Sequence, residues 1–170
     1  ANTLTYTGTE QALITAGETA DGTIGYKLTE SAEYSAAIPT GKNAGTYTVY
    51  YKITGDANHS DLEDHFSVTI AQAKVTAPTV SEQTYTYNGS EQTYVFGSDG
   101  DSDQYTVSNN IRKDAGSQTV TVTLKDPDNT KWASELPTYT FTIEKADAEI
   151  TTAPKPVPDL TYTGSSQQLV

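Results

Sequence analysis

Hydrophobic and polar residues alternate with a period of two in four segments of the chain. In residues 46–53, with the sequence TYTVYYKI, Tyr47, Val49, Tyr51 and Ile53 fall on one face. Residues 66–70, 119–125 and 139–143 alternate in the same way. This period is expected for a β-strand with one buried and one solvent-facing side. The pattern therefore predicts four strands, two in each half of the chain.

Shorter segments rich in Thr, Tyr and Val are further strand candidates, separated by turn-forming Gly, Asp and Asn residues. They are residues 4–7, 11–15, 23–28, 33–38, 84–87, 92–96 and 104–108. No segment sustains the 3.6-residue period of an amphipathic helix, so we expect an all-β fold of antiparallel sandwiches. A small β-grasp fold is the alternative, because the alanines of residues 29–39, TESAEYSAAIP, allow a helical turn.

One short phrase occurs three times, as LTYTG at 4–8, YTYNG at 85–89 and LTYTG at 160–164. Ala-Gly at 44–45 recurs at 115–116, and the spacing between copies is that of a small domain rather than of a solenoid repeat. We therefore expect two tandem domains, residues 1–73 and 74–146, followed by the opening strands of a third in residues 147–170. The side chains placed in their cores are Tyr6, Tyr47, Tyr51 and Phe66 and, in the second copy, Tyr87, Val120, Val122 and Phe141.

The third copy consists only of its opening, and the first lacks the Ala-Pro stretch found at 77–78 and 153–154. We expect the chain to be a segment of a longer protein. We also expect residues 148–152 or 160–170 to add as a strand to a sheet edge, in their own chain or in a second copy, because backbone polar groups need partners.

Charge narrows the possible partners. The chain has 22 acidic and 10 basic residues, a net charge of -12, and its basic residues are scattered. Such a chain repels phosphate backbones and anionic membranes, so we expect neither nucleic-acid binding nor membrane insertion. It contains no cysteine, which excludes disulfides and thiolate chemistry.

An acidic stretch places Asp99, Asp101 and Asp103 at alternate positions, like the first three ligands of a calcium loop. An EF-hand loop also needs a glycine at its sixth position and a glutamate at its twelfth, where this chain has Gln104 and Asn110. A looser calcium site is the only cofactor site that the sequence suggests. We favour a solvated loop.

Trp132 is the only tryptophan, in a polar loop. Exposed aromatic rings stack on sugars, but we favour a ring that caps the open end of a sandwich. His59 and His65 are the only imidazoles, and no G-x-S-x-G nucleophile turn accompanies them. The sequence therefore favours a protein that is not an enzyme.

The order LTYTG, then IPTGKNAGTYTVYYKITGDAN, then FSVTIAQA resembles the tandem MBG-type, Ig-like repeats of bacterial cell-surface proteins. The second copy departs from the first, with DAGSQTVTVTL in place of NAGTYTVYYKI. The resemblance implies two Ig-like β-sandwich domains in an extracellular protein, wall-attached or secreted. Their role would be that of a stalk or of adhesive repeats. The alternatives are a module that binds host glycan or protein, and an accessory domain of a secreted carbohydrate-active enzyme.

Overall fold

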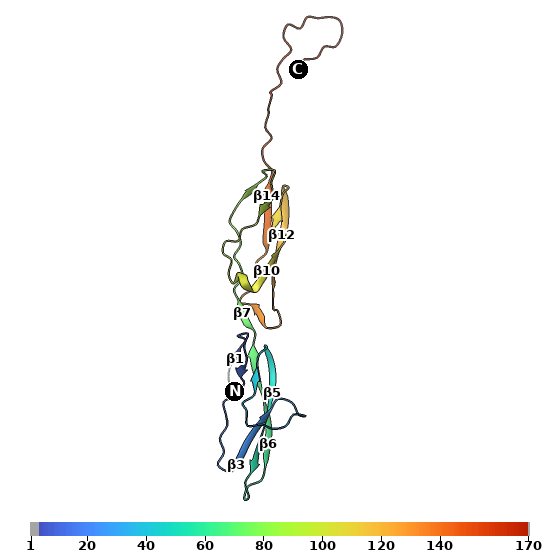
Figure 1. Cartoon of the computed structure of the whole chain (residues 1–170). Helices are drawn as coiled ribbons and strands as arrows, with labels where there is room; N and C mark the ends of the chain where they lie inside the picture. The colour runs from blue at the N-terminus through green and yellow to red at the C-terminus, as the bar shows by residue number, and fades with distance from the viewer. Residues whose placement is uncertain (1–3, 170) are drawn as a thin grey trace.

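The computed structural model describes residues 4–169, so residues 1–3 and 170 of the predicted segments lie outside the described residues. The chain forms two slender lobes that follow one another end to end, and residues 147–169 extend from the far end (Figure 1). The described residues contain β-strands and one short 3-10 helix, η1 (Ser102–Gln104), but no α-helix. The prediction of an all-β fold is confirmed.

The first lobe is built on a four-stranded sheet in the order β1-β6-β5-β3. Its strands are β1 (Leu4–Thr5), β3 (Gly22–Lys27), β5 (Gly45–Gly55) and β6 (Leu62–Ala71), and a small sheet pairs β2 (Gln11–Ala12) with β4 (Thr40–Gly41). The two sheets enclose a cluster of buried side chains, made of Leu13, Ile14, Tyr26, Val49, Val68 and Ile70.

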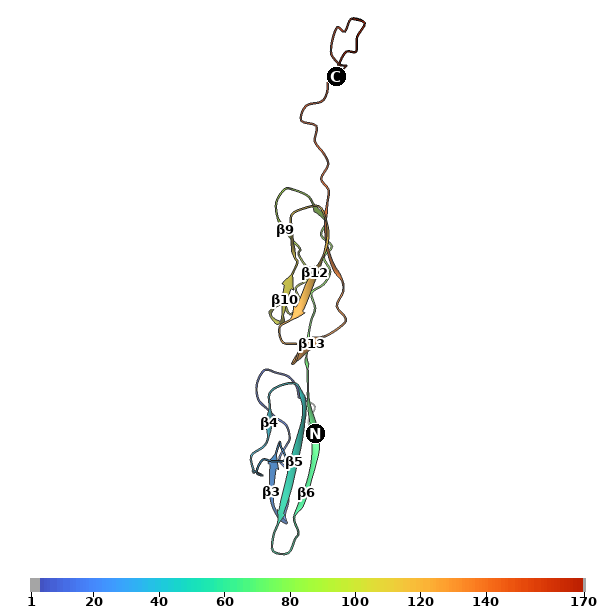
Figure 2. The same ribbon diagram turned by 90° about the vertical axis from the view of Figure 1, so that its right-hand side faces the viewer.

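The second lobe repeats this plan with the sheet order β10-β12-β14-β8. Its strands are β8 (Tyr85–Thr86), β10 (Tyr105–Ser108), β12 (Gly116–Leu124) and β14 (Tyr139–Glu144), with β9 (Gln92–Thr93) paired to β11 (Ile111–Arg112). A third pairing joins β13 (Thr130–Trp132) to β7 (Ala73–Val75), the segment that connects the lobes (Figure 2). The buried cluster contains Val75, Tyr85, Tyr94, Tyr105, Val120, Val122, Tyr139, Phe141 and Ile143.

The sheet register shows how closely the two lobes correspond. In the first lobe Ile70 lies between Leu4 and Gly45, and in the second Ile143 lies between Tyr85 and Gly116. The expectation of purely antiparallel sheets needs correction, because β1 runs parallel to β6, β8 to β14 and β13 to β7. In the second lobe the first and last strands run in the same direction because the chain enters at one end and leaves at the other.

Residues 33–38 do not form the predicted strand. They contain a single bridge, between Ser35 and Tyr26, within a segment of turns and bends. The helix considered for residues 29–39 in a β-grasp fold is also absent from this segment. The alanines at 32, 36 and 37 are exposed, so they provide no buried apolar face that would stabilise a helix here.

The prediction that Phe66 and Tyr87 lie in the cores is wrong. Phe66 is 36% exposed and Tyr87 is 39% exposed, whereas Phe141 is fully buried and Val120 nearly so. Tyr87 lies just beyond the end of β8, and Tyr85 is buried instead. At Phe66, other segments cover the core-facing side of the sheet only in part. Tyr6, Tyr47 and Tyr51 are half-buried at the margin of the first cluster.

Residues 147–169 contain no strand, so the prediction that this tail pairs with a sheet edge of its own chain is wrong. The tail leads away from both four-stranded sheets (Figure 1). Its last part nevertheless repeats the turn of the other copies, since Gly8, Gly89 and Gly164 have φ angles of 80, 80 and 78°. The turn is therefore a local property of the sequence.

Candidate functional site

Several hydrogen bonds hold the joint between the lobes. We define the joint as Ala44, Gln72 and Ala73 together with the loop of residues 126–130. The side-chain oxygen of Asn129 accepts a hydrogen bond from the Ala44 backbone N–H at 2.8 Å. The backbone carbonyl of Asn129 accepts a second one from the Ala73 N–H at 3.0 Å. The Gln72 amide donates to the Pro127 carbonyl at 2.9 Å. One loop of the second lobe thus holds both the first lobe and the connecting strand.

The loop itself is rigidly held. The Asn129 amide donates to both carboxylate oxygens of Asp126 at 3.0 Å, and the Thr130 N–H donates to the Asp126 carbonyl at 2.9 Å. The Thr130 hydroxyl donates to the same carbonyl, and Thr130 is the buried polar residue among those described, at 5% exposure. Burial raises the pKa of the Tyr6 hydroxyl, and the nearby Asp126 carboxylate raises it further. Tyr6 belongs to the first lobe, so this interaction also spans the joint.

An apolar groove runs along the first lobe. Its walls come from the segment after β2, from β3, β5 and β6, and its volume is about 340 Å³. The lining includes Ile14, Ala16, Ile24, Tyr26, Tyr51 and Phe66. The polar side chains that line it are Thr15, Tyr26 and Tyr51, and the Tyr26 hydroxyl already accepts the Gly17 N–H at 2.6 Å. This surface suits an apolar, extended occupant better than a charged one.

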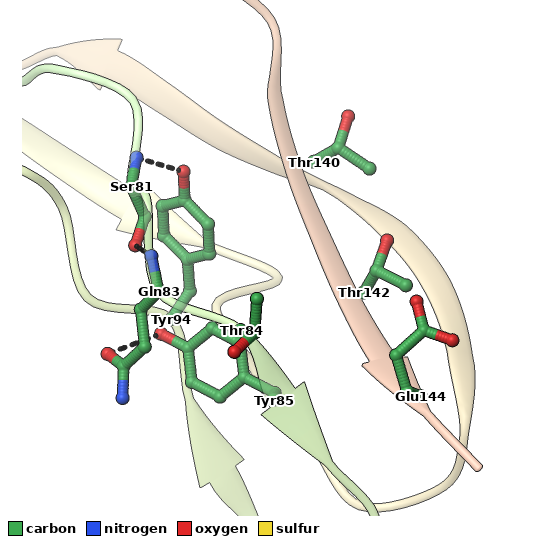
Figure 3. Close-up of a pocket in the computed structure, with 8 residues that line it drawn as sticks. All are labelled: Ser81, Gln83, Thr84, Tyr85, Tyr94, Thr140, Thr142 and Glu144. Atoms are coloured by element: carbon green, nitrogen blue, oxygen red, sulfur yellow. Dashed lines mark hydrogen bonds between the residues drawn. The ribbon is translucent and has the colours of Figure 1, made fainter.

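A smaller, polar pocket lies in the second lobe between β14 and the segment before β8 (Figure 3). Thr140, Thr142 and Glu144 form one wall. On the other, the Tyr94 hydroxyl accepts the Ser81 N–H at 2.9 Å. The volume is about 130 Å³, well below the roughly 300 Å³ at which small-molecule sites begin. We therefore do not treat this pocket as a ligand site.

The structure does not bring Asp99, Asp101 and Asp103 together as metal ligands. The Asp101 carboxylate accepts the Thr76 N–H at 2.6 Å, while the backbone carbonyls of Asp99 and Asp103 accept the Tyr105 hydroxyl and the Lys125 ammonium. Among residues 4–169, no group of three or more His, Asp or Glu side chains is placed to hold a metal ion. The visible role of Asp101 is to fix the connecting segment to its lobe.

Trp132 lies on β13 at the end of the second lobe nearest the joint (Figure 2). Its half-buried ring is 5.8 Å from that of Tyr105, and its backbone pairs with Val75. This packing favours the interpretation that the ring caps the end of the lobe over the interpretation that it stacks on sugars. Both interpretations stay predictions.

The two histidines lie apart from each other. His59 Nδ1 is 2.7 Å from Asp56 Oδ1 in the loop after β5, and the His65 ring packs at 5.3 Å on that of Tyr50.

The joint was not predicted from the sequence. Asn129 lies in a polar loop, and its partners Ala44 and Ala73 are 85 and 56 positions away in the chain, so no local pattern connects them. One signal was available. The connection between the two long strands spans residues 56–61 in the first lobe but 125–138 in the second. The additional residues of the second lobe form β13 and the loop of residues 126–130.

Neither a known protein family nor a curated protein nor a solved structure matches the chain at a significant level. Within residues 4–169, no helix has the length and hydrophobicity required to cross a membrane.

Proposed function

We propose that the chain is a spacer, a stalk segment of an extracellular bacterial surface protein, in which repeated β-lobes joined end to end hold a distal binding region away from its base. The joint is the observation that carries this proposal. A flexible tether needs no contacts between lobes, whereas here one asparagine bonds to the first lobe, to the connecting strand and to its own loop. These bonds restrict bending, which is what a spacer requires.

Two features of the sequence support the cell-surface setting. The recurring motifs resemble MBG-type, Ig-like repeats of bacterial surface proteins, and the net charge of -12 keeps an extended chain soluble and free of self-association through nonspecific contacts. The proposal assigns no chemical reaction to the chain. Its mechanism is geometric: the chain enters the second lobe at one end and leaves at the other, so each added lobe extends the array.

The rigidity of the joint is testable by pulsed electron paramagnetic resonance. The chain has no cysteine, so Ser67→Cys and Thr121→Cys, on exposed positions of β6 and β12, give one spin label per lobe. We expect a narrow distance distribution in this background. Adding Asn129→Ala removes the acceptor of the Ala44 N–H and the donors to Asp126, at a cost of about 1–3 kcal/mol, and is expected to broaden the distribution.

Asn58→Ala is the matched control, because Asn58 is exposed in the corresponding loop at the opposite end of the first lobe. It should leave the distribution unchanged. A broad distribution before any change to Asn129, or equal widths for all three proteins, would contradict a rigid spacer.

A further inference from the structure

The segment that enters the second lobe runs along the length of this lobe. We call residues 73–87 the clamp segment. It begins with β7 at the joint and ends just after β8, beside the strand end from which the tail leaves (Figure 1). β7 pairs in parallel with β13, and β8 pairs in parallel with the end of β14. The entering segment and the leaving strand therefore lie alongside each other and point in the same direction.

Hydrogen bonds hold the clamp segment between these two strand pairs as well. The Asp101 carboxylate accepts the Thr76 N–H at 2.6 Å, and the Thr76 carbonyl accepts the Asp101 N–H at 3.0 Å. The Thr79 N–H donates to the Ser98 carbonyl at 3.0 Å, and the Thr79 carbonyl accepts the Gly97 N–H at 3.1 Å. The bonds to the body of the lobe are thus spread along the clamp segment rather than gathered at one end.

The clamp segment also belongs to the core of the lobe. Val75 is 2% exposed and Pro78 is fully buried. The hydroxyl of Tyr139, the first residue of β14, donates to the Pro78 carbonyl at 2.8 Å. At the other end of β14, the Glu144 carbonyl accepts the Tyr87 N–H at 2.9 Å. The clamp segment is therefore bonded to the leaving strand at both ends of that strand.

A pull along the long axis of the lobe loads these contacts in shear. Tension from the first lobe arrives through β6, which ends at Ala71, and passes into β7, which begins at Ala73. It leaves through β14 into the tail. Such a pull draws the clamp segment toward the joint and β14 away from it, so the two must slide past each other. Hydrogen bonds run across the strand direction, so sliding strains many of them together, whereas peeling breaks them one after another.

We propose that the second lobe carries tension along its long axis and that the clamp segment resists unfolding under this load. The inference rests on the proposed function, because a stalk that is fixed at one end and pulled at the other carries such a load. Forced unfolding is governed by the unfolding rate, and the contacts that must break first depend on the direction of the pull. The resistance of the lobe is therefore directional.

Optical tweezers applied to the full chain test the effect of direction. The chain has no cysteine, so Lys74→Cys with Glu144→Cys attaches the two handles at exposed positions on β7 and at the end of β14. Ser117→Cys with Glu144→Cys moves one handle to β12, beside the end of β14, because Ser117 pairs with Thr142. The first pair of handles shears the clamp segment, and the second peels β12 from β14. We expect the first pair to require the higher unfolding force at the same loading rate.

Tyr139→Phe tests one bond of the clamp segment, because it removes the hydroxyl that donates to the buried Pro78 carbonyl. With the first pair of handles at constant force, the unfolding rate should rise about tenfold, and with the second pair it should change less. Tyr87→Phe is the matched control, because Tyr87 ends the same segment with its side chain 39% exposed. It should leave both rates unchanged. Circular dichroism checks that each variant is folded.

Equal unfolding forces for the two pairs of handles, or a lower force for the first pair, would overturn the inference. So would a Tyr139→Phe chain that unfolds no faster than the wild-type chain in shear, or that unfolds faster by the same factor in both directions, since the latter is a general loss of stability. Failure here leaves the rigidity of the joint untouched, because the distances between spin labels are measured without load.

Discussion

At the scale of single residues, aromatic packing dominates the second lobe. Phe141 is fully buried, and the rings of Tyr85 and Tyr94 meet it edge-on with centroids 4.8 and 5.8 Å away. Such T-shaped contacts add to the burial of apolar area, because the positive edge of one ring meets the negative face of another. A small lobe has little other buried surface to offer, so each ring matters.

Replacing Phe141 with alanine is expected to destabilise the second lobe by about 3–5 kcal/mol, from lost burial and the cavity left behind. Urea unfolding followed by the fluorescence of Trp132, the only tryptophan, reports on this lobe. Val95→Ala is the control, because Val95 is 55% exposed and its truncation should cost about 0.5 kcal/mol or less. A loss below about 1 kcal/mol for Phe141→Ala would show that the ring is not central to the core.

The Asp61 carboxylate gives the first lobe a pH-dependent contribution to stability. The Lys52 ammonium, 2.8 Å away, lowers the pKa of Asp61 below its ordinary value of 3.8, and the Gly55 N–H lowers it further. A lowered folded-state pKa means that the contribution is present above the unfolded value and is lost as pH falls through the folded one.

Asp61→Asn should therefore lower the Tm at pH 7, and the difference from wild type should shrink toward pH 3. Differential scanning calorimetry at several pH values measures this. Asp147→Asn, in the tail, changes the net charge equally and should show no such dependence. A difference that stays constant with pH would exclude this carboxylate as the source.

At the scale of elements, one turn recurs in all three copies with the same side-chain bond. Gln11, Gln92 and Gln167 donate to the carbonyls of Thr5, Thr86 and Thr161 at 3.0, 3.0 and 2.6 Å. In each copy this bond closes a turn whose glycine has a positive φ, which a residue with a side chain adopts only at a cost. The third copy forms the turn without any packed sheet beneath it.

Gln92→Ala is expected to cost the second lobe about 0.5–1.5 kcal/mol, the usual worth of one hydrogen bond. Gln167→Ala removes the same bond in the tail, which contributes no side chain to either buried cluster. Its effect on the thermal unfolding of the lobes should be nil. Equal effects of the two substitutions would mean that the turn does not support the lobe.

At the scale of the whole molecule, each lobe is stabilised by its own core, whereas the contacts between the lobes determine the overall shape. Each lobe has its own buried cluster, while the joint of Ala44, Gln72, Ala73 and residues 126–130 sets how one lobe follows the next. The broadening expected for Asn129→Ala belongs to this scale. This substitution removes no buried apolar side chain, so it is expected to leave the lobes folded.

The sequence by itself determined the long strands, the repeated turns and the all-β class. These depend on interactions between near neighbours, such as the alternation along residues 46–53 and the glycine in each YTG or YNG turn. It also placed Val120, Val122 and Phe141 correctly, because other segments cover the core-facing side of the sheet in the second lobe.

Only the tertiary structure decided which of two equivalent positions is buried and how the lobes are joined. Phe66 and Tyr139 occupy matching sites, yet burial depends on whether another segment lies over them, and alternation along a strand carries no information about that cover. Asn129 acts through partners that are distant in the chain. Which segment covers a strand, and which loop contacts the other lobe, depend on residues far apart in the chain. The local pattern of hydrophobic and polar residues does not encode such contacts.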